Sequence, residues 1–194
     1  MKASASVALL LSASAIAFAQ PPTTFTCGSY VADDGKAAPI AWTTHNVKAS
    51  ETTEPLRLEV EPKIRGTTDS AVLPLAPLRL YTLTMTCRRG PGLGLEARVN
   101  WVGADKKPGS RYMVWQLPDR YRINWWPLSA LKNTYKQRFC LPPEATQVTL
   151  QFVLTGHPDA GYNYFELYDL SLTRGAEVPF GQRLGPNLCP GGDM

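Results

Sequence analysis

Residues 81–87 read YTLTMTC, and this stretch decides the fold class. Its apolar side chains, from Tyr81 to Cys87, alternate with three threonines. That is the period of a β-strand with one face on a hydrophobic core. The same alternation recurs in residues 56–61, 93–101 and 147–155. Four such segments predict a mostly β domain, and we expect Trp42 and Trp101 to belong to its core.

Proline and glycine separate these segments. Gly90-Pro91-Gly92 lies between two of them and predicts a hairpin turn. Strands divided by such turns are typical of an antiparallel β-sandwich or barrel. The other breakers are Pro74, Pro77, Pro108-Gly109, Pro118, Pro127, Pro142-Pro143 and Pro158.

The last strand changes phase. Phe165 and Leu167 are at odd-numbered positions, whereas Leu170 and Leu172 are at even-numbered ones, so in a regular strand the two pairs would face opposite sides. A β-bulge near Tyr168 would bring all four side chains onto one face. A strand buried on both faces at that end is the alternative.

The N-terminus has the three parts of a secretory signal. Lys2 supplies a positive charge, residues 7–18 are apolar apart from small serines, and Ala17-Phe18-Ala19 fits a cleavage site before Gln20. The apolar run is shorter than the roughly 20 residues that span a bilayer. We therefore expect a signal peptide at 1–19, a β-sandwich at 20–174, a Gly/Pro-rich coil at 175–194, and a secreted, extracellular protein without membrane insertion.

Four cysteines remain after the signal peptide. In an exported chain an even number favours disulfides, and four cysteines allow three pairings. The preferred pairing joins Cys27 to Cys189, which ties the two ends together, and Cys87 to Cys140, which joins two strands. No pair has the C-x-x-C spacing typical of a zinc site.

Charge excludes some partners. Without Lys2, 19 basic and 16 acidic residues remain, and the basic ones are scattered, with no cluster beyond Arg88-Arg89 and Lys106-Lys107. Proteins that bind nucleic acids usually have their basic residues concentrated on one face. We therefore expect no nucleic-acid partner and interpret these residues as solvated surface.

Three stretches in order resemble the galactose-binding-like jelly rolls of carbohydrate-binding modules. Residues 80–85 (LYTLTM) follow the turn at Pro77, as a similar strand does in that family. Residues 134–142 (TYKQRFCLP), followed by Ala145 and residues 148–150, resemble a late strand, a proline and the next strand; Tyr135 stands where the family usually has tryptophan. Residues 164–172 (YFELYDLSL) are similar to the closing strand, so the likeness spans roughly residues 54–174.

Two departures from that family concern calcium. The family's opening N-P-G-F-E motif is replaced by a segment that contains Cys27, and Tyr168 replaces the first of two paired aspartates. Many modules of that family carry a structural calcium ion, and Asp169 is the one candidate ligand at a matching position, but a single carboxylate does not by itself predict the ion. We expect no other cofactor.

Aromatic and planar polar residues are dense between Arg111 and Trp126. Flat rings stack on the apolar face of a sugar, and amide or guanidinium groups orient its hydroxyls. Trp125 and Trp126 are adjacent, so in a strand they would point to opposite faces. The alternative is that these rings fill the core or cover a sheet edge. The candidate ligand-binding residues are Trp115, Tyr121, Arg122, Asn124, Trp125 and Trp126.

No catalytic residues stand out. The chain has no G-x-S-x-G motif, and His45 and His157 are its two histidines, which leaves few nucleophile–base pairs. The resemblance therefore implies a non-catalytic protein that binds a polysaccharide or glycan through exposed aromatic residues. The alternative is a secreted β-sandwich that binds another extracellular protein, with the same rings as interface hot spots.

Overall fold

The computed structural model describes residues 22–31, 35–53, 55–103, 106, 108–112, 131–158, 161 and 163–177, with backbone only for 51–53 and 109–112. These residues form β-strands joined by turns, and none of them is helical. Within this part of the chain there is accordingly no helix that could cross a membrane. The strands are β1 (Thr24–Val31), β2 (Ala37–His45), β3 (Lys48–Thr53), β4 (Leu56–Glu59), β5 (Arg65–Ser70), β6 (Arg79–Arg89), β7 (Leu93–Val102), β8 (Pro108–Tyr112), β9 (Asn133–Cys140), β10 (Gln147–Gly156) and β11 (Tyr164–Glu177).

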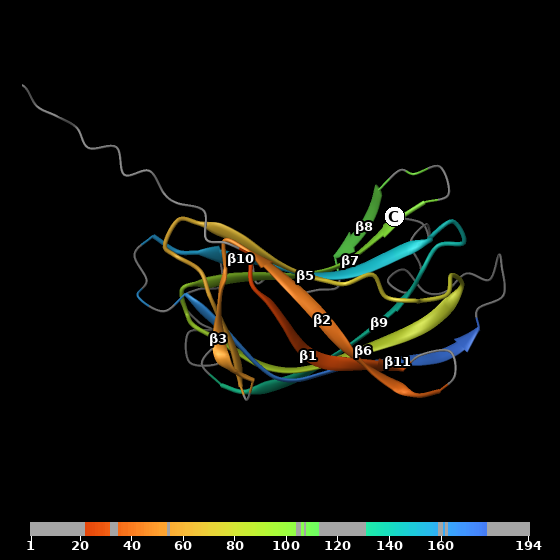
Figure 1. The fold of residues 1–194 in the computed structure, drawn as a ribbon, viewed down its shortest axis with the longest axis horizontal. Helices are drawn as coiled ribbons and strands as arrows, with labels where there is room; N and C mark the ends of the chain where they lie inside the picture. Colours follow the sequence, from red (N-terminus) through yellow and green to blue (C-terminus); the bar gives the residue numbers. More distant parts are fainter. Residues whose placement is uncertain are drawn as a thin grey trace, which may run out of the picture.

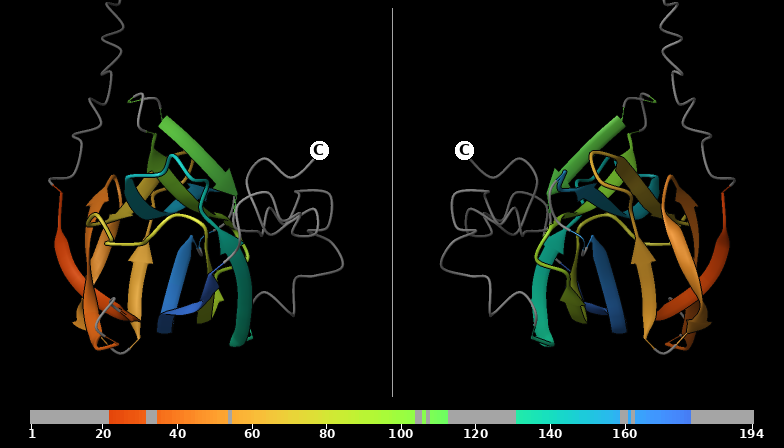
Figure 2. Two further views of the ribbon diagram at one scale, coloured as in Figure 1. Left: turned by 90° about the vertical axis from the view of Figure 1, so that its right-hand side faces the viewer. Right: turned by 90° about the vertical axis from the view of Figure 1, so that its left-hand side faces the viewer.

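The strands form two layers of a β-sandwich (Figure 1). One layer contains β3, β4, β11, β6 and β9, and the other contains β2, β5, β10, β7 and β8. β1 joins the layers because it pairs with β11 on one side and with β2 on the other. β1 and β2 close one side of the molecule, while β8 and β9 lie toward the other (Figure 2). Every strand pair is antiparallel except β1–β11.

The four alternating segments are confirmed as β4, β6, β7 and β10. The apolar side chains from Tyr81 to Cys87 on β6 are buried, and the three threonines between them are partly exposed, as one-sided packing requires. The turn at Gly90-Pro91-Gly92 is also confirmed, and the Leu93 N–H donates a hydrogen bond of 3.1 Å to the Gly90 carbonyl. The strand type is therefore confirmed, but the hairpin is wrong. β6 pairs with β9 and β11 in one layer, whereas β7 pairs with β10 and β8 in the other, so this turn crosses between the layers.

The core lies between the layers and is built around three rings in contact. Phe152 on β10 lies between Trp42 on β2 and Phe165 on β11, with ring centroids 5.2 Å and 5.4 Å apart. Trp42 is buried, as predicted, whereas Trp101 is partly buried against the edge of the core. One buried aromatic group thus connects both layers.

The bulge in the last strand is confirmed. On β6, Cys87 pairs with Leu167 and Thr86 pairs with Asp169, so Tyr168 is the extra residue on β11. The shift places Phe165, Leu167, Leu170 and Leu172 in the core. Tyr168 instead extends the outer face of the layer, where it contacts the polar network described below.

The predicted Cys87–Cys140 disulfide is wrong. In the β6–β9 pair, Cys140 lies opposite Leu80, and Cys87 lies opposite Asn133 at the other end. Seven residues of strand separate the two cysteines, about 23 Å at the usual rise per residue. A disulfide requires Cα atoms within about 7 Å. No disulfide joins Cys27, Cys87 and Cys140 to one another, and Cys189 lies outside the described residues.

Candidate functional site

The outer face of the β2–β5–β10–β7 layer is lined with polar side chains. One row of paired residues crosses it, from Thr43 through Asp69 and Gln151 to Arg98. Inward-facing neighbours such as Phe152 fill the core, so the polar residues occupy the opposite face by strand alternation. Four strands that are distant in sequence therefore combine to form one polar surface.

A groove of about 520 Å³ opens at one end of this face. It lies where β10, β7 and β8 run side by side, because Gln147 pairs with Val102, which in turn pairs with Pro108. Its volume is within the range of about 300–1,000 Å³ that is usual for small-molecule sites. The described residues that line it are Val72, Asn100, Trp101, Val102, Pro108, Gln147 and Thr149.

The polar groups of the groove have no hydrogen-bond partner among the described residues. The side chains of Asn100, Gln147 and Thr149 make no hydrogen bond to any described residue. Elsewhere on the same face several polar groups are paired. Gln151 donates a hydrogen bond of 2.7 Å to Asp69, and Arg98 forms an ion pair with Glu96. The groove is therefore a part of this face where three neighbouring polar side chains are free to bond a ligand.

The described lining of the groove is uncharged. Two side-chain amides and a hydroxyl provide donors and acceptors, while Val72, Val102 and Pro108 provide apolar contact. Val72 is 58% exposed, so its side chain is available to a ligand. This combination suits a neutral ligand that presents both hydroxyl groups and C–H surface.

The six ligand-binding residues predicted from the sequence lie outside the described residues. They follow β8, whose first residue, Pro108, lines the groove. Sequence reasoning missed the residues of the groove itself. Asn100 and Gln147 looked like ordinary polar positions of alternating strands, and no local signal distinguished them.

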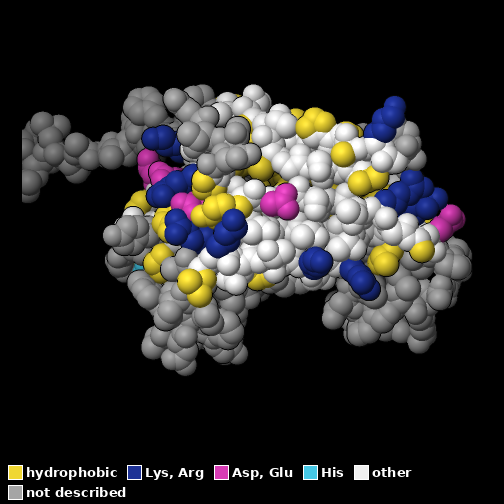
Figure 3. Space-filling view, turned by 90° about the horizontal axis from the view of Figure 1, so that it is seen from below, with side chains coloured by type: hydrophobic (Ala, Val, Ile, Leu, Met, Phe, Trp, Pro, Cys, Tyr) yellow, Lys and Arg dark blue, Asp and Glu magenta, His cyan; other side chains and the backbone are white. Residues whose placement is uncertain are grey.

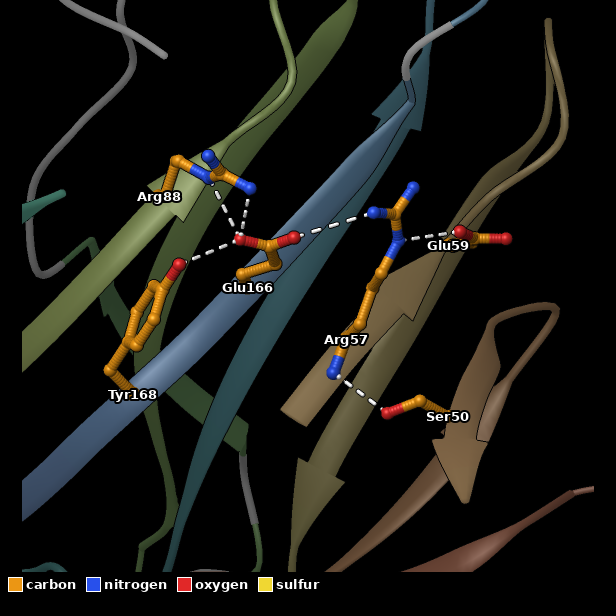
Figure 4. A network of polar contacts seen from close by, with 6 residues as sticks. All are labelled: Ser50, Arg57, Glu59, Arg88, Glu166 and Tyr168. Atoms are coloured by element: carbon orange, nitrogen blue, oxygen red, sulfur yellow. Dashed lines mark hydrogen bonds and ion pairs between the residues drawn. The ribbon is translucent and has the colours of Figure 1, made fainter. Parts of the chain in front are cut away.

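A polar network occupies the outer face of the other layer, centred on Glu166 of β11 (Figure 4). Glu166 is only 4% exposed. Its carboxylate accepts hydrogen bonds from Arg88 at 2.8 Å and from the Tyr168 hydroxyl at 2.9 Å. Arg57 reaches the other carboxylate oxygen at 3.3 Å and also pairs with Glu59 at 2.6 Å. Both oxygens of the buried carboxylate are thus satisfied within the protein, so we assign this network a structural role.

The network holds the pKa of Glu166 below its usual value. Burial alone would raise this pKa, but the hydrogen bonds from Arg88 and Tyr168 and the charges of Arg88 and Arg57 together outweigh burial. The unfolded chain then binds a proton more readily than the folded protein. The stabilising effect of Glu166 is complete above its unfolded pKa and is lost as the pH falls through the folded pKa.

Acidification is therefore expected to destabilise the protein partly through Glu166. Between pH 6 and pH 3, the melting temperature of the wild type should fall by more than that of Glu166→Gln, which has no carboxylate to protonate. Thermal unfolding of both proteins, followed by circular dichroism, measures this difference. Equal falls in the two proteins would contradict the assigned role of Glu166.

Asp169, the candidate calcium ligand, is exposed and follows the extra residue of the bulge. Within the described part of the chain there is no group of three or more His, Cys, Asp or Glu side chains that could hold a metal ion. A hard cation such as calcium takes six to eight oxygen ligands. The described surroundings of Asp169 do not fit a calcium site.

Comparison with known proteins finds no matching family model and no curated protein of significant sequence similarity. Some solved structures are similar in fold. The CBM22-1 xylan-binding domain from Paenibacillus barcinonensis is 10% identical with a TM-score of 0.49, covering 69% of this chain and 85% of that one. The enzymatically active domain of bacteriophage CBA120 tailspike protein 4 is 12% identical with a TM-score of 0.48, covering 79% of this chain. This chain spans 19% of the length of the tailspike chain.

Further similar structures include family 16 and CBM4 carbohydrate-binding modules and an accessory secretory protein structure from Streptococcus pneumoniae. The last of these is 15% identical with a TM-score of 0.43, covering 68% of this chain and 87% of that one. Similarity at this level does not establish what the present chain binds. That question depends on the groove.

Proposed function

We propose that this protein binds an uncharged glycan in the groove formed by β10, β7 and β8. The observation that carries the proposal is the set of neutral polar groups on Asn100, Gln147 and Thr149, which have no partner among the described residues. An amide both donates and accepts hydrogen bonds, as does each hydroxyl of a sugar. The apolar residues beside the amides would contact the C–H surface of the same ring.

The lining favours binding over catalysis. Acid–base chemistry requires a titratable group within hydrogen-bond reach of the reacting atoms. None of the described residues that line the groove carries one. We therefore propose a binding protein whose groove positions a glycan without transforming it.

Export and aromatic stacking belong to the proposal as well. The N-terminal residues 1–19 have the pattern of a signal peptide, which would take the protein to the compartment where polysaccharides occur. The aromatic residues that begin at Trp115 follow β8 in the chain. We propose that they add stacking surface to a ligand held by the groove.

Removing the two amides is expected to weaken glycan binding by about tenfold or more. Each side-chain hydrogen bond contributes about 1 kcal/mol, and 1.4 kcal/mol corresponds to a factor of ten. Isothermal titration calorimetry of the wild type and the Asn100→Ala/Gln147→Ala variant, with xylohexaose, cellohexaose and mannohexaose, measures the change.

The matched control is Asn133→Ala/Gln137→Ala, which removes the same two residue types from β9 on the other layer. It should bind within about twofold of the wild type. A loss of the same size in both variants would show that the groove is not the site. Absence of binding to any neutral glycan would contradict the proposed function.

A further inference from the structure

The outer face of β9, β6 and β11 presents a regular surface of hydroxyl groups and cations. Three rows of paired residues cross these strands, and each row has a threonine of β6 at its centre. Figure 3 shows this side of the molecule as a pale area of uncharged polar side chains and backbone between groups of Lys and Arg. From β9 to β11, the rows are Arg138–Thr82–Thr173, Lys136–Thr84–Ser171 and Thr134–Thr86–Asp169.

Two cations on this face have no counter-charge among the residues that the structure describes. Lys136 and Arg138 are exposed, and neither forms an ion pair with any described residue. Their row partners on β6 and β11 are neutral hydroxyl residues, and the acidic member of the three rows, Asp169, lies at the far end of its own row. The arginines of the Glu166 network on the same layer are by contrast already paired with carboxylates.

The spacing of these groups suits an extended ligand. Lys136 and Arg138 are two residues apart on one strand, so they project from the same face about 7 Å apart along it. The hydroxyls of neighbouring strands lie about 5 Å to the side. An arginine matches an anionic oxygen pair with its planar fork, and a lysine binds anions as a point charge.

We propose that the outer face of β9, β6 and β11 binds an anionic polysaccharide, with Lys136 and Arg138 contacting its acidic groups and the threonine rows contacting its hydroxyls. Lys136 and Arg138 are neighbours on one strand, and strand pairing places the threonine rows beside them. The three rows contain no aromatic residue. Proteins that bind single-stranded nucleic acids, by contrast, stack the bases on aromatic side chains. A hydroxyl-rich polyanion therefore fits this surface better than a single-stranded nucleic acid does.

This surface lies on the opposite layer from the groove, so the two proposals can fail separately. The experiment measures affinity by calorimetry for polygalacturonate, which is carboxylated, and for chondroitin sulfate, with dextran as a neutral reference. The wild type should bind one or both anionic glycans and not dextran. The Lys136→Gln/Arg138→Gln variant should bind at least about fivefold more weakly, while its affinity for a neutral glycan in the groove stays unchanged.

The control is Lys63→Gln/Lys106→Gln, which changes the net charge by the same amount at two exposed turn positions. Its affinity for the anionic glycan should remain within twofold of the wild type. The proposal is overturned if neither anionic glycan binds, if both double variants lose affinity equally, or if duplex DNA binds as tightly with the same dependence on Lys136 and Arg138. Binding to polygalacturonate alone would assign the site to carboxylates, and binding to chondroitin sulfate alone would assign it to sulfates.

Discussion

Phe152→Ala is expected to lower the free energy of unfolding by about 3–5 kcal/mol, the usual cost of removing a buried phenylalanine. Phe152 is 2% exposed, and its ring lies between Trp42 of one layer and Phe165 of the other. The substitution removes apolar contact and leaves a cavity where the two layers meet. Urea denaturation followed by tryptophan fluorescence measures the change.

Val72→Ala provides the comparison for Phe152→Ala. Its side chain is 58% exposed, so the same kind of truncation should cost no more than about 0.5 kcal/mol. A loss below about 1.5 kcal/mol for Phe152→Ala would show that the aromatic stack does not hold the layers together.

Glu166→Ala is expected to lower the free energy of unfolding by about 2 kcal/mol. The buried carboxylate accepts hydrogen bonds from Arg88, Tyr168 and Arg57, and hydrogen bonds to charged groups contribute about 1.5–3 kcal/mol. The cost is smaller than for a fully buried ion pair, because the side chains of Arg57 and Arg88 are 40% and 36% exposed and can be hydrated. Chemical denaturation at pH 7 measures it.

Glu59→Ala tests whether burial makes the difference. The Glu59 side chain is 45% exposed and pairs with Arg57 at the surface. Exposed pairs contribute about 0.2–1 kcal/mol. If Glu59→Ala destabilised the protein as much as Glu166→Ala, the network would not be centred on Glu166.

The strands were predictable where one face is apolar and the other polar. β4, β6, β7 and β10 all have this alternation, which follows directly from one-sided packing. β5 (RGTTDS) lacks apolar side chains altogether and gave no such signal. It is a strand because it pairs with β2 and β10, and pairing between distant segments cannot be read from local composition.

The bulge and the cysteines illustrate the same limit. The phase change around Tyr168 was visible because it lies within one strand. Cys87 and Cys140 do lie on adjacent strands, as predicted. The predicted disulfide was wrong because the two residues lie at opposite ends of those strands. Only the register between β6 and β9 determines that separation.

The groove could not be predicted for a similar reason. Its unpaired side chains come from β7 and β10, about 47 residues apart in sequence, and are identified by the absence of partners. Gly28 on β1 shows a similar dependence on a distant strand, because the backbone of β11 lies close to it. Its φ is +77°, and a Cβ atom there would lie 2.7 Å from the Leu170 carbonyl oxygen of β11.

The central claim, that a neutral glycan binds in the groove, is tested most directly by NMR. Two-dimensional 1H–15N spectra recorded during titration with xylohexaose, cellohexaose or mannohexaose include the side-chain amide signals of Asn100 and Gln147. We expect a binding glycan to shift these signals together with the backbone amides of Val102 and Thr149, leaving Lys136 and Arg138 unchanged. A glycan that binds without shifting the groove signals, or shifts only those of the opposite layer, would contradict the account.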